Sequence, residues 1–449
     1  MSELRPRIGL FSACMIVMGS IIGSGIFKKV APMTLKLQSE KWVLLCWLVA
    51  GIVTLFATLT YAEVASRTAQ TGGLYSYLRE MYGKWVSYLY GWSCFSIIQT
   101  ASIASIAYVF AESVLGVFPN LSLVLSVKLI AIFSILLLSF INFLGVIFGA
   151  LVENIFTVLK ILGIILVIIL GFHSSLPPEP VEVVKNSLPF TGGALVPALF
   201  SAMLGAFWAY DGFNNVGFLG GEVIQPRKNI PLALVLGVIA VLVIYLLVNL
   251  AYFHAFSVKE ISTVANQKGL IFAVEMVKRI YGNGWAKIIS LLLMASTFGA
   301  TNSSILASSR IYYAMAKDKV FFSIFQRVHP RFGTPSVALL AQAIWASLLV
   351  LLGSFDELTD MLIFASFAFY GLGAFGLFRL RKTSQSAFTV PSWIPLSYGF
   401  FCFLLVFVNI WEAPKQALVG AILVFSGLPL VWLISRSYFA SVAQESTGK

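Results

Sequence analysis

Charged residues are scarce in this 449-residue chain, since Asp, Glu, Lys and Arg make up 11% of it and hydrophobic residues 59%. A soluble globular domain has about 25% charged residues, so the composition excludes that class. No long polar or low-complexity stretch is present either. Instead, apolar stretches of membrane-spanning length recur from end to end. The sequence therefore predicts an integral membrane protein.

Histidine and cysteine are also scarce, with three and four residues. The histidines are scattered, and the four cysteines all fall within apolar stretches, where none has metal-ligand spacing and none is available for a disulfide between loops. An intramembrane enzyme would need a constellation of nucleophile, base or metal ligands, and these residues supply none. We therefore expect no enzyme, no metal site and no cofactor, and we interpret the cysteines as small packing residues. They are Cys14, Cys46, Cys94 and Cys402.

Hydropathy predicts an all-α integral membrane fold with twelve transmembrane helices. A further apolar segment, Leu270–Tyr281, is short and carries three charged residues, so we interpret it as an interfacial helix. The predicted spans are 8–35, 41–66, 85–115, 122–142, 147–171, 195–221, 230–256, 285–316, 335–353, 358–380, 393–411 and 414–435.

The formal net charge of +12 follows the predicted topology. With the N-terminus inside, most Lys and Arg residues of the loops lie on the inner side, among them Arg67, Arg79, Arg227, Arg310 and Arg381. Basic loops favour the cytoplasmic side, so both termini are predicted to be cytoplasmic and the protein to be a multi-pass protein of the cell membrane. No basic domain lies outside the spans, so we expect no nucleic-acid partner.

Two of the predicted spans are interrupted near their middle. The span Ile8–Phe27 contains the run Gly19-Ser20-Ile21-Ile22-Gly23-Ser24-Gly25, and the span Leu195–Gly220 contains Ala209-Tyr210-Asp211-Gly212. Non-helical backbone at membrane depth persists only beside a cavity or another part of the protein. Paired interrupted helices in corresponding positions of two halves indicate the binding site of a transporter.

The longest predicted loop, 172–194, contains three prolines and divides the spans into two sets of five. Residues 1–449 would form a single transmembrane transporter domain, with residues 8–171 as the first repeat and 195–380 as the second. An odd number of helices per repeat makes the two repeats inverted relative to each other in the membrane. Two extra helices, in 393–435, would follow.

The glycines of the first interruption allow two interpretations. Gly19 and Gly23 form a small-xxx-small pattern, which lets helices pack closely. Alternatively, Gly23, Ser24 and Gly25 permit unwound backbone whose N–H groups, at the start of a half-helix, suit a carboxylate.

The second interruption carries an acid, Asp211, at membrane depth. Such a group is costly and faces a cavity or a partner, so either it pairs with a buried base or it belongs to a binding site. The break would also release the carbonyl groups of Phe207, Trp208 and Ala209 to accept hydrogen bonds from an ammonium. Amides on one side and carbonyls on the other suit a zwitterionic α-amino acid.

Lys160 lies in the middle of a span, with long apolar flanks on both sides. Its ammonium could hold unwound backbone carbonyls, as a bound sodium ion would. The alternative is a pairing with Glu153, two helical turns away.

Two further residues are candidates for gating. Trp208 stands beside the second break and could close over a substrate, or it could be ordinary aromatic bulk. Glu222, in a loop with two prolines, could pair with Arg310 or Arg67 in an inner gate, or the loop could be rigid and solvated.

These residues together resemble the amino acid–polyamine–organocation superfamily and, within it, the L-type amino acid transporter family with its bacterial exchangers. The matching motifs span most of helices 1–9. They are Gly19-Ser20-Ile21-Ile22-Gly23-Ser24-Gly25-Ile26-Phe27, Thr71-Gly72-Gly73-Leu74-Tyr75-Ser76-Tyr77-Leu78, Ala209-Tyr210-Asp211-Gly212, Gly221-Glu222 with Pro226, Asn229 and Pro231, Ser309-Arg310 with Met315-Ala316 and Asp318, Val328-His329-Pro330 and Thr334-Pro335.

The resemblance implies a twelve-helix inverted-repeat fold and sodium-independent amino acid transport, commonly as obligatory exchange. It places the substrate carboxylate at the backbone of Gly23–Gly25, Ser24 included. It places the lysine of helix 5, Lys160, against the broken first helix in place of sodium, with Asn302 and Ser303 where helix 8 faces that lysine. It places the substrate amine at carbonyls of Ile21, Trp208, Ala209 and Asp211.

The chain departs from the family pattern at three positions. Many members have Phe where Trp208 stands, Trp where Phe213 stands and Gly where Ser303 stands, which leaves the geometry of the gate open. Mammalian relatives use a cysteine between helices 3 and 4 to link a glycoprotein partner, and no cysteine occurs there in this chain. We therefore expect a stand-alone protein of a bacterial inner membrane, without a disulfide-linked heavy subunit.

Our main hypothesis is a secondary transporter of neutral L-amino acids, small or large, that exchanges them by alternating access. A proton- or sodium-coupled symporter, with Asp211 or Glu153 as the titrating group, is the second hypothesis. A non-transporting amino acid sensor is the third, although no signalling domain supports it.

Overall fold

The computed structural model describes residues 6–68, 70–174, 195–265, 271–386 and 388–430. Within these ranges the regular secondary structure is helical, apart from two isolated β-bridges. Eight helices are long and apolar enough to cross a membrane, and the shorter apolar helices Val127–Phe143, Pro197–Tyr210, Ser336–Leu352 and Pro414–Leu430 accompany them. The predicted all-α membrane class is confirmed.

The first predicted span is broken at its glycines. It is divided into α1 (Leu10–Ile21), α2 (Gly25–Lys28) and α3 (Val30–Leu37). A β-carbon on Gly25 would lie 2.6 Å from the β-carbon of Ala209, so the start of α2 packs directly against the other broken helix. Only glycine permits so close an approach.

The second span is broken at Asp211, between α10 (Leu195–Tyr210) and α11 (Asn215–Phe218). Gly212 has a φ of +92°, a left-handed conformation that glycine adopts at low cost. A β-carbon there would lie 2.8 Å from the carbonyl oxygen of Ser20, in the first break. The two interruptions therefore touch each other.

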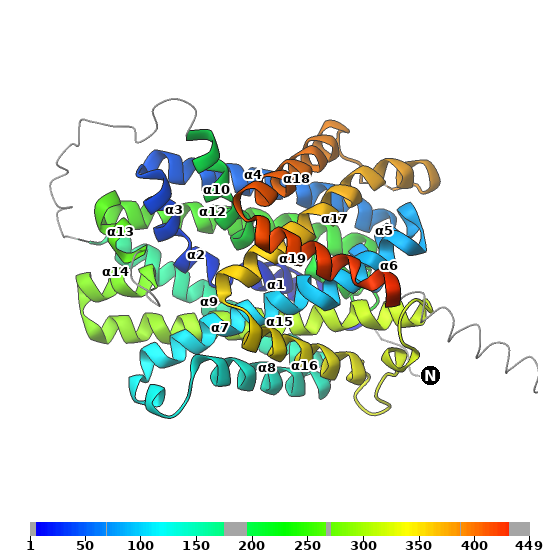
Figure 1. The fold of residues 1–449 in the computed structure, drawn as a ribbon, viewed down its shortest axis with the longest axis horizontal. Helices are drawn as coiled ribbons and strands as arrows, with labels where there is room; N and C mark the ends of the chain where they lie inside the picture. The colour runs from blue at the N-terminus through cyan, green and yellow to red at the C-terminus, as the bar shows by residue number, and fades with distance from the viewer. Residues whose placement is uncertain (1–5, 69, 175–194, 266–270, 387, 431–449) are drawn as a thin grey trace, which may run out of the picture.

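Long helices enclose the two breaks (Figure 1). The broken helix α1 packs against α9 (Val146–Phe172), α12 (Pro226–Ala255) and α15 (Asn283–Lys317), and α10 packs against α4 (Glu40–Arg67). The breaks consequently lie in the protein interior, where surrounding helices can satisfy the freed backbone groups.

The third predicted span is one continuous helix with a π turn inside it. It consists of α6 (Lys84–Ser93), η1 (Cys94–Ile98) and α7 (Gln99–Val117). Single π turns are frequent at functional sites because they re-aim the side chains that follow. Here the turn ends where Ile98 and Gln99 reach the region of the two breaks.

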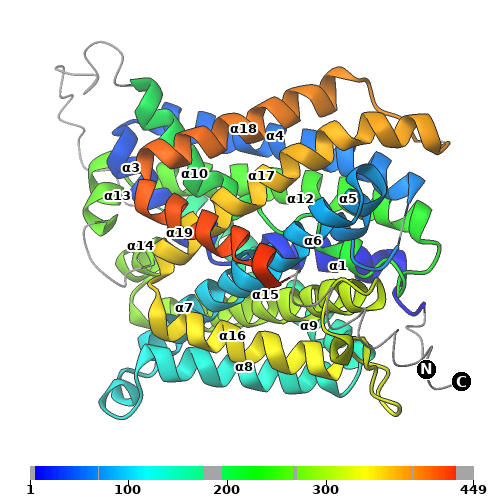
Figure 2. The ribbon, with the colours of Figure 1, turned by 45° about the vertical axis from the view of Figure 1, so that its right-hand side comes forward.

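Other helices form the periphery. Figure 2 shows α8 (Val127–Phe143) beside α16 (Ser336–Leu352) along one side, while α18 (Trp393–Glu412) lies beside α4 on the opposite side. The remaining elements are α5 (Leu74–Tyr82), η2 (Pro119–Leu123), α13 (Val258–Ala265), α14 (Phe272–Tyr281), η3 (Ser323–Gln326), α17 (Phe355–Thr383) and α19 (Pro414–Phe425).

The predicted span 122–142 begins too early. Residues 119–123 form η2, and α8 starts only at Val127, where the Oγ of Ser126 caps it by accepting a hydrogen bond from the amide of Leu129 at 3.3 Å. Apolar composition alone does not reveal such a cap. The predicted loop 172–194 and the end of the span 414–435 fall mostly outside the described residues, as do both chain ends and Leu270.

Candidate functional site

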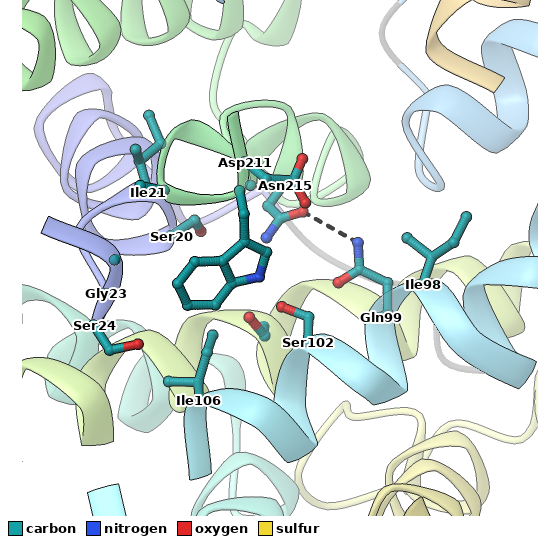
Figure 3. Close-up of a pocket in the computed structure, with 15 residues that line it drawn as sticks. Ser20, Ile21, Gly23, Ser24, Ile98, Gln99, Ser102, Ile106, Asp211 and Asn215 are labelled. Carbon is teal, nitrogen blue, oxygen red and sulfur yellow. Dashed lines mark hydrogen bonds between the residues drawn. The ribbon is translucent and has the colours of Figure 1, made fainter. Parts of the chain in front are cut away.

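A pocket lies where the two broken helices meet, and the π-turn helix α7 closes its far wall (Figure 3). The volume of this cavity is about 30 Å³. Ligand pockets measure ~300–1,000 Å³, so the lining residues are closely packed around this one. All seven residues predicted to bind substrate line it: Ile21, Gly23, Ser24, Gly25, Trp208, Ala209 and Asp211.

The first break presents hydrogen-bond donors. The N–H groups of Ser24, Gly25 and Ile26, at the start of α2, have no acceptor among the described residues. The hydroxyl of Ser24 is fully buried and also has no partner there. Unbonded buried donors are costly, so this end of the pocket is complementary to an acceptor such as a carboxylate.

The second break presents hydrogen-bond acceptors. The hydroxyl of Tyr245, on α12, lies between these acceptors and the backbone of the first break. The Tyr245 hydroxyl lies 3.1 Å from the carbonyl oxygens of both Ile21 and Ala209. The Ile21 carbonyl also accepts the amide of Gly23 at 2.8 Å. The hydroxyl of Tyr245 has one hydrogen, which the carbonyls of Ile21 and Ala209 share, and the contacts of a substrate amine with these carbonyls stay predictions.

Asp211 does not pair with a buried base within the described chain. Its Oδ1 accepts a hydrogen bond from the hydroxyl of Tyr370 at 2.9 Å. Among the described residues that line the pocket, Asp211 is the only ionisable one. The acid is thus oriented by a neutral donor, and its carboxyl group lies in the wall of the pocket.

The fully buried Lys160 contacts the first broken helix. Its Nζ donates a hydrogen bond to the carbonyl oxygen of Gly19 at 2.8 Å, in the last turn of α1. The alternative pairing is not observed, since no ion pair among the described residues joins Lys160 to Glu153. A charge on α9 therefore supports the backbone immediately before the break.

Within the described chain, no hydrogen bond joins Asn302 or Ser303 to this lysine. Asn302 donates to the carbonyl oxygen of Gly149 at 3.0 Å, and the hydroxyl of Ser303 lies 2.6 Å from that of Ser20, in the first break. It is Gly299, one turn earlier on α15, that faces the ammonium of Lys160. A single sequence does not specify which of the small and polar residues of α15 faces a given neighbour.

Trp208 is buried at one end of the pocket and packs edge-on against Phe355, with ring centroids 5.2 Å apart. The ammonium of Lys29 lies 5.0 Å from the Phe355 ring and 5.3 Å from the Trp208 ring. Nearby, Lys28 forms an ion pair with Glu112 at 2.7 Å. These contacts connect α2, α7, α10 and α17 beside the pocket.

Glu222 forms a fully buried ion pair with Arg310, with Nη2 of the arginine 3.1 Å and Nε 3.2 Å from the two carboxylate oxygens. Of the two predicted partners, the structure thus selects Arg310, because Arg67 is bonded to Glu63 at 2.7 Å. The backbone carbonyl of Glu222 also accepts the amide of Ile8 at 2.9 Å. The start of α1 is therefore fastened to the loop after α11.

The wall formed by α7 carries site residues that the sequence analysis did not single out. The side-chain amide of Gln99 donates to Oδ1 of Asn215, on α11, at 3.4 Å (Figure 3). Ser102, one turn along α7, and Ser304, on α15, also line this wall. Polar residues at positions 99 and 102 within an apolar span were the available signal, because they lie on one helix face.

The described residues contain no group of three or more His, Cys, Asp or Glu side chains that could hold a metal ion. The four cysteines are free thiols and lie within helices. The chemistry of the pocket is thus that of backbone amides, carbonyls, hydroxyls, side-chain amides and one carboxylate.

The chain is similar to known proteins over most of its length. A family model described as amino acid permease matches residues 8–434. The serine/threonine exchanger SteT of Bacillus subtilis (strain 168) is 33% identical over 396 residues, which cover 86% of this chain and 87% of that protein. The human b(0,+)-type amino acid transporter 1 is 30% identical, covering 98% and 90% of the two chains. The mouse Asc-type amino acid transporter 1 is 31% identical, covering 96% and 81%.

Proposed function

Because the chain belongs to the amino acid permease family, we propose that it is a membrane transporter that exchanges neutral L-amino acids by alternating access, without sodium. One observation carries this proposal. The two broken helices meet in a small pocket that has, at one side, amides without an acceptor among the described residues and, at the other, the carboxyl group of Asp211 and backbone carbonyls. This arrangement is complementary to the two charged ends of an α-amino acid.

In the proposed complex, the substrate carboxylate accepts hydrogen bonds from the amides of Ser24 and Gly25 and from the Ser24 hydroxyl. The substrate ammonium binds the carbonyls of Trp208 and Ala209 and the carboxylate of Asp211. Both formal charges of the substrate are then compensated by the two breaks. No ionisable side chain among the described lining residues remains for a third charge, which favours substrates with neutral side chains.

The wall opposite the breaks favours small polar side chains. Gln99 and Asn215 form a hydrogen-bonded amide pair there, and Ser102 and Ser304 add hydroxyl groups. A site built from buried donors and acceptors rejects apolar analogues, because these would leave its groups unpaired. We therefore propose that amino acids with a hydroxyl or amide side chain, such as serine or threonine, are preferred over leucine or phenylalanine.

The proposal includes the membrane arrangement. The eight long and four shorter apolar helices form twelve spans within one transport domain, residues 1–449, with 8–171 and 195–380 as inverted repeats and 393–435 as two extra helices. An odd number of spans per repeat and basic inner loops support this topology, with both termini cytoplasmic. The protein acts alone in the plasma membrane of a bacterium, because no cysteine between the third and fourth spans is available to link a heavy subunit.

Reconstituted proteoliposomes test the proposed exchange. Uptake of radiolabelled serine should be fast into vesicles loaded with unlabelled serine and slow into empty vesicles, and replacing external sodium by choline should not change it. Equal uptake into loaded and empty vesicles would contradict exchange. A thermal-shift screen of the purified protein against the twenty amino acids then ranks the substrates independently of transport.

A further inference from the structure

Three glutamates of the described chain are fully buried, and only two of them form an ion pair. Glu63 is bonded to Arg381 at 2.7 Å, and Glu222 is bonded to Arg310 at 3.1 Å. Glu153, on α9, has an exposed fraction of 0%, yet no Lys, Arg or His of the described chain forms an ion pair with it. Glu153 therefore differs from Glu63 and Glu222 because no ion pair compensates a negative charge on its carboxyl group.

Among the described residues, only neutral side chains donate hydrogen bonds to the carboxyl group of Glu153. The hydroxyl of Thr157 donates to its Oε1 at 2.9 Å, and the side-chain amide of Asn302 lies 3.5 Å from its Oε2. Its third neighbour is the backbone of α1, where a β-carbon on Gly19 would overlap Oε1. The carboxyl group thus lies in the interface where α9 packs closely against α1, the helix that ends at the first break.

The nearest cation along α9 does not form a hydrogen bond with Glu153. Lys160 lies two turns beyond Glu153, and its Nζ donates to the Gly19 carbonyl. The helix α1 contains no charged residue, and charged groups on the other helices packed against α9 lie at or near helix ends or in formed ion pairs. These are Lys128 on α8, Arg227, Lys228 and His254 on α12, Glu275, Lys278 and Arg279 on α14, and Lys287, Arg310 and Lys317 on α15.

An ionised carboxylate is costly in such a place. Burial removes the hydration of the charge, and the described residues offer only neutral hydrogen-bond donors and the through-space attraction of Lys160 in return. The uncharged carboxylic acid avoids this cost and adds a donor of its own. Close packing of α1 against α9 is therefore favourable when Glu153 is protonated and unfavourable when Glu153 is ionised.

We infer that Glu153 is a proton-binding site. Its carboxyl group is protonated while α1 lies against α9, and it releases the proton to water when the two helices separate. The inference rests on the proposed function in one respect, since alternating access supplies the movement of α1. When that contact opens, water reaches the carboxyl group, its proton passes to water and the carboxylate is hydrated. Reclosure requires a proton to return, so pH controls the rate of exchange through this residue.

The transport test compares pH profiles. Serine exchange is measured with equal pH on both sides, from about pH 5 to pH 8, in the wild type, Glu153→Gln and the control Glu275→Gln, which alters a glutamate in a surface ion pair of α14. Wild type and control should change in rate by at least ~3-fold across this range, whereas Glu153→Gln should stay nearly constant. Parallel profiles of the wild type and Glu153→Gln would overturn the inference.

A second measurement does not depend on transport. Infrared difference spectra of the wild type in detergent, between acid and alkaline pH, should contain the carbonyl stretch of a protonated carboxyl group, and this band should shift in Glu153→Asp and vanish in Glu153→Gln. An identical band in all three proteins would exclude Glu153 as the proton site. If Glu153→Gln does not fold, the shift of the carbonyl band in Glu153→Asp alone shows whether Glu153 binds the proton.

The two measurements separate the inference from the proposed function. Absence of serine exchange together with a Glu153-dependent infrared band would refute the proposed substrate and retain the proton site. Exchange with no such band would retain the function and refute the site.

Discussion

The ammonium nitrogen of Lys160 lies 2.8 Å from the carbonyl oxygen of Gly19, and both groups are buried. The carbonyl belongs to the last turn of α1, where the interruption of the helix leaves backbone acceptors without intrahelical donors. A side-chain cation on a neighbouring helix thus supplies the donor that the break removes. The relationship explains how unwound backbone is maintained without a bound ion.

We expect Lys160→Ala to lower the serine exchange rate by roughly tenfold or more, because an unsatisfied buried carbonyl costs about 1–3 kcal/mol and the start of the pocket loses its support. Initial rates in proteoliposomes, at matched protein density, measure the effect. Lys128→Ala is the control, since this exposed lysine of α8 also donates to a backbone carbonyl, that of Leu351. Equal rates in Lys160→Ala and the wild type would show that the ammonium does not support the break.

The buried pair of Glu222 and Arg310 should contribute strongly to stability. Arg310→Met leaves an uncompensated buried carboxylate, so we expect a loss of about 3–5 kcal/mol in the free energy of unfolding. Melting in detergent, followed by tryptophan fluorescence, measures it, and the double variant Glu222→Gln/Arg310→Met should recover part of the loss. The surface pair of Glu275 and Arg279 is the control, where Glu275→Gln should cost at most ~1 kcal/mol. A double variant less stable than Arg310→Met would contradict the ion-pair argument.

Two tyrosines of α12 form a matched pair of test positions. The hydroxyl of Tyr245 bonds carbonyls of both breaks, whereas that of Tyr252, two turns later, is buried without a partner in the described chain. Tyr245→Phe should therefore weaken serine binding by about 3- to 10-fold, which corresponds to ~0.5–1.5 kcal/mol, while Tyr252→Phe should be neutral. Isothermal titration of the purified variants decides, and equal affinities in both variants would contradict the assigned role of Tyr245.

The amide pair of Gln99 and Asn215 should determine side-chain preference. We expect Gln99→Ala to raise the KM for serine by about 5- to 50-fold, since Asn215 loses its partner, while the KM for alanine changes little. Competition by unlabelled amino acids against labelled serine measures the preference. Ser113→Ala, near the far end of α7, is the control, because that hydroxyl bonds only the backbone carbonyl of Val109. A uniform loss for all substrates would indicate a packing role instead.

The spans and their interruptions could be predicted because they depend on local properties of the chain. Long apolar runs specify membrane helices, and glycines or an acid such as Asp211 interrupt them wherever they occur. Lys160 was recognisable for the same reason, since a cation in mid-span needs a partner. The boundaries were close except at the start of α8, where a capping serine, Ser126, delays the helix, and at the start of α12, which begins at Pro226, four residues before the predicted position.

The partners of these residues could not be predicted in the same way. A polar face indicates which side of a helix points inward but not which residue of another helix it meets, so nothing local pairs Asp211 with Tyr370 or Gln99 with Asn215. The choice of Arg310 over Arg67 for Glu222 likewise depends on how α15 packs against the loop after α11. Orientation and partner choice arise from tertiary packing, whereas position in the chain is local information.

The β-bridge between Ile8 and Val223 has a consequence for biosynthesis. The amide of Ile8 is bonded to the carbonyl of Glu222, and the amide of Ile224 to the carbonyl of Ile8, so the chain start pairs with residues more than two hundred positions later. A ribosome inserts the first helix long before those partners exist. The backbone at the amino-terminal end of α1 therefore stays unpaired until the second broken helix has been synthesised and inserted. Formation of the β-bridge between Ile8 and Val223 is thus a late folding event.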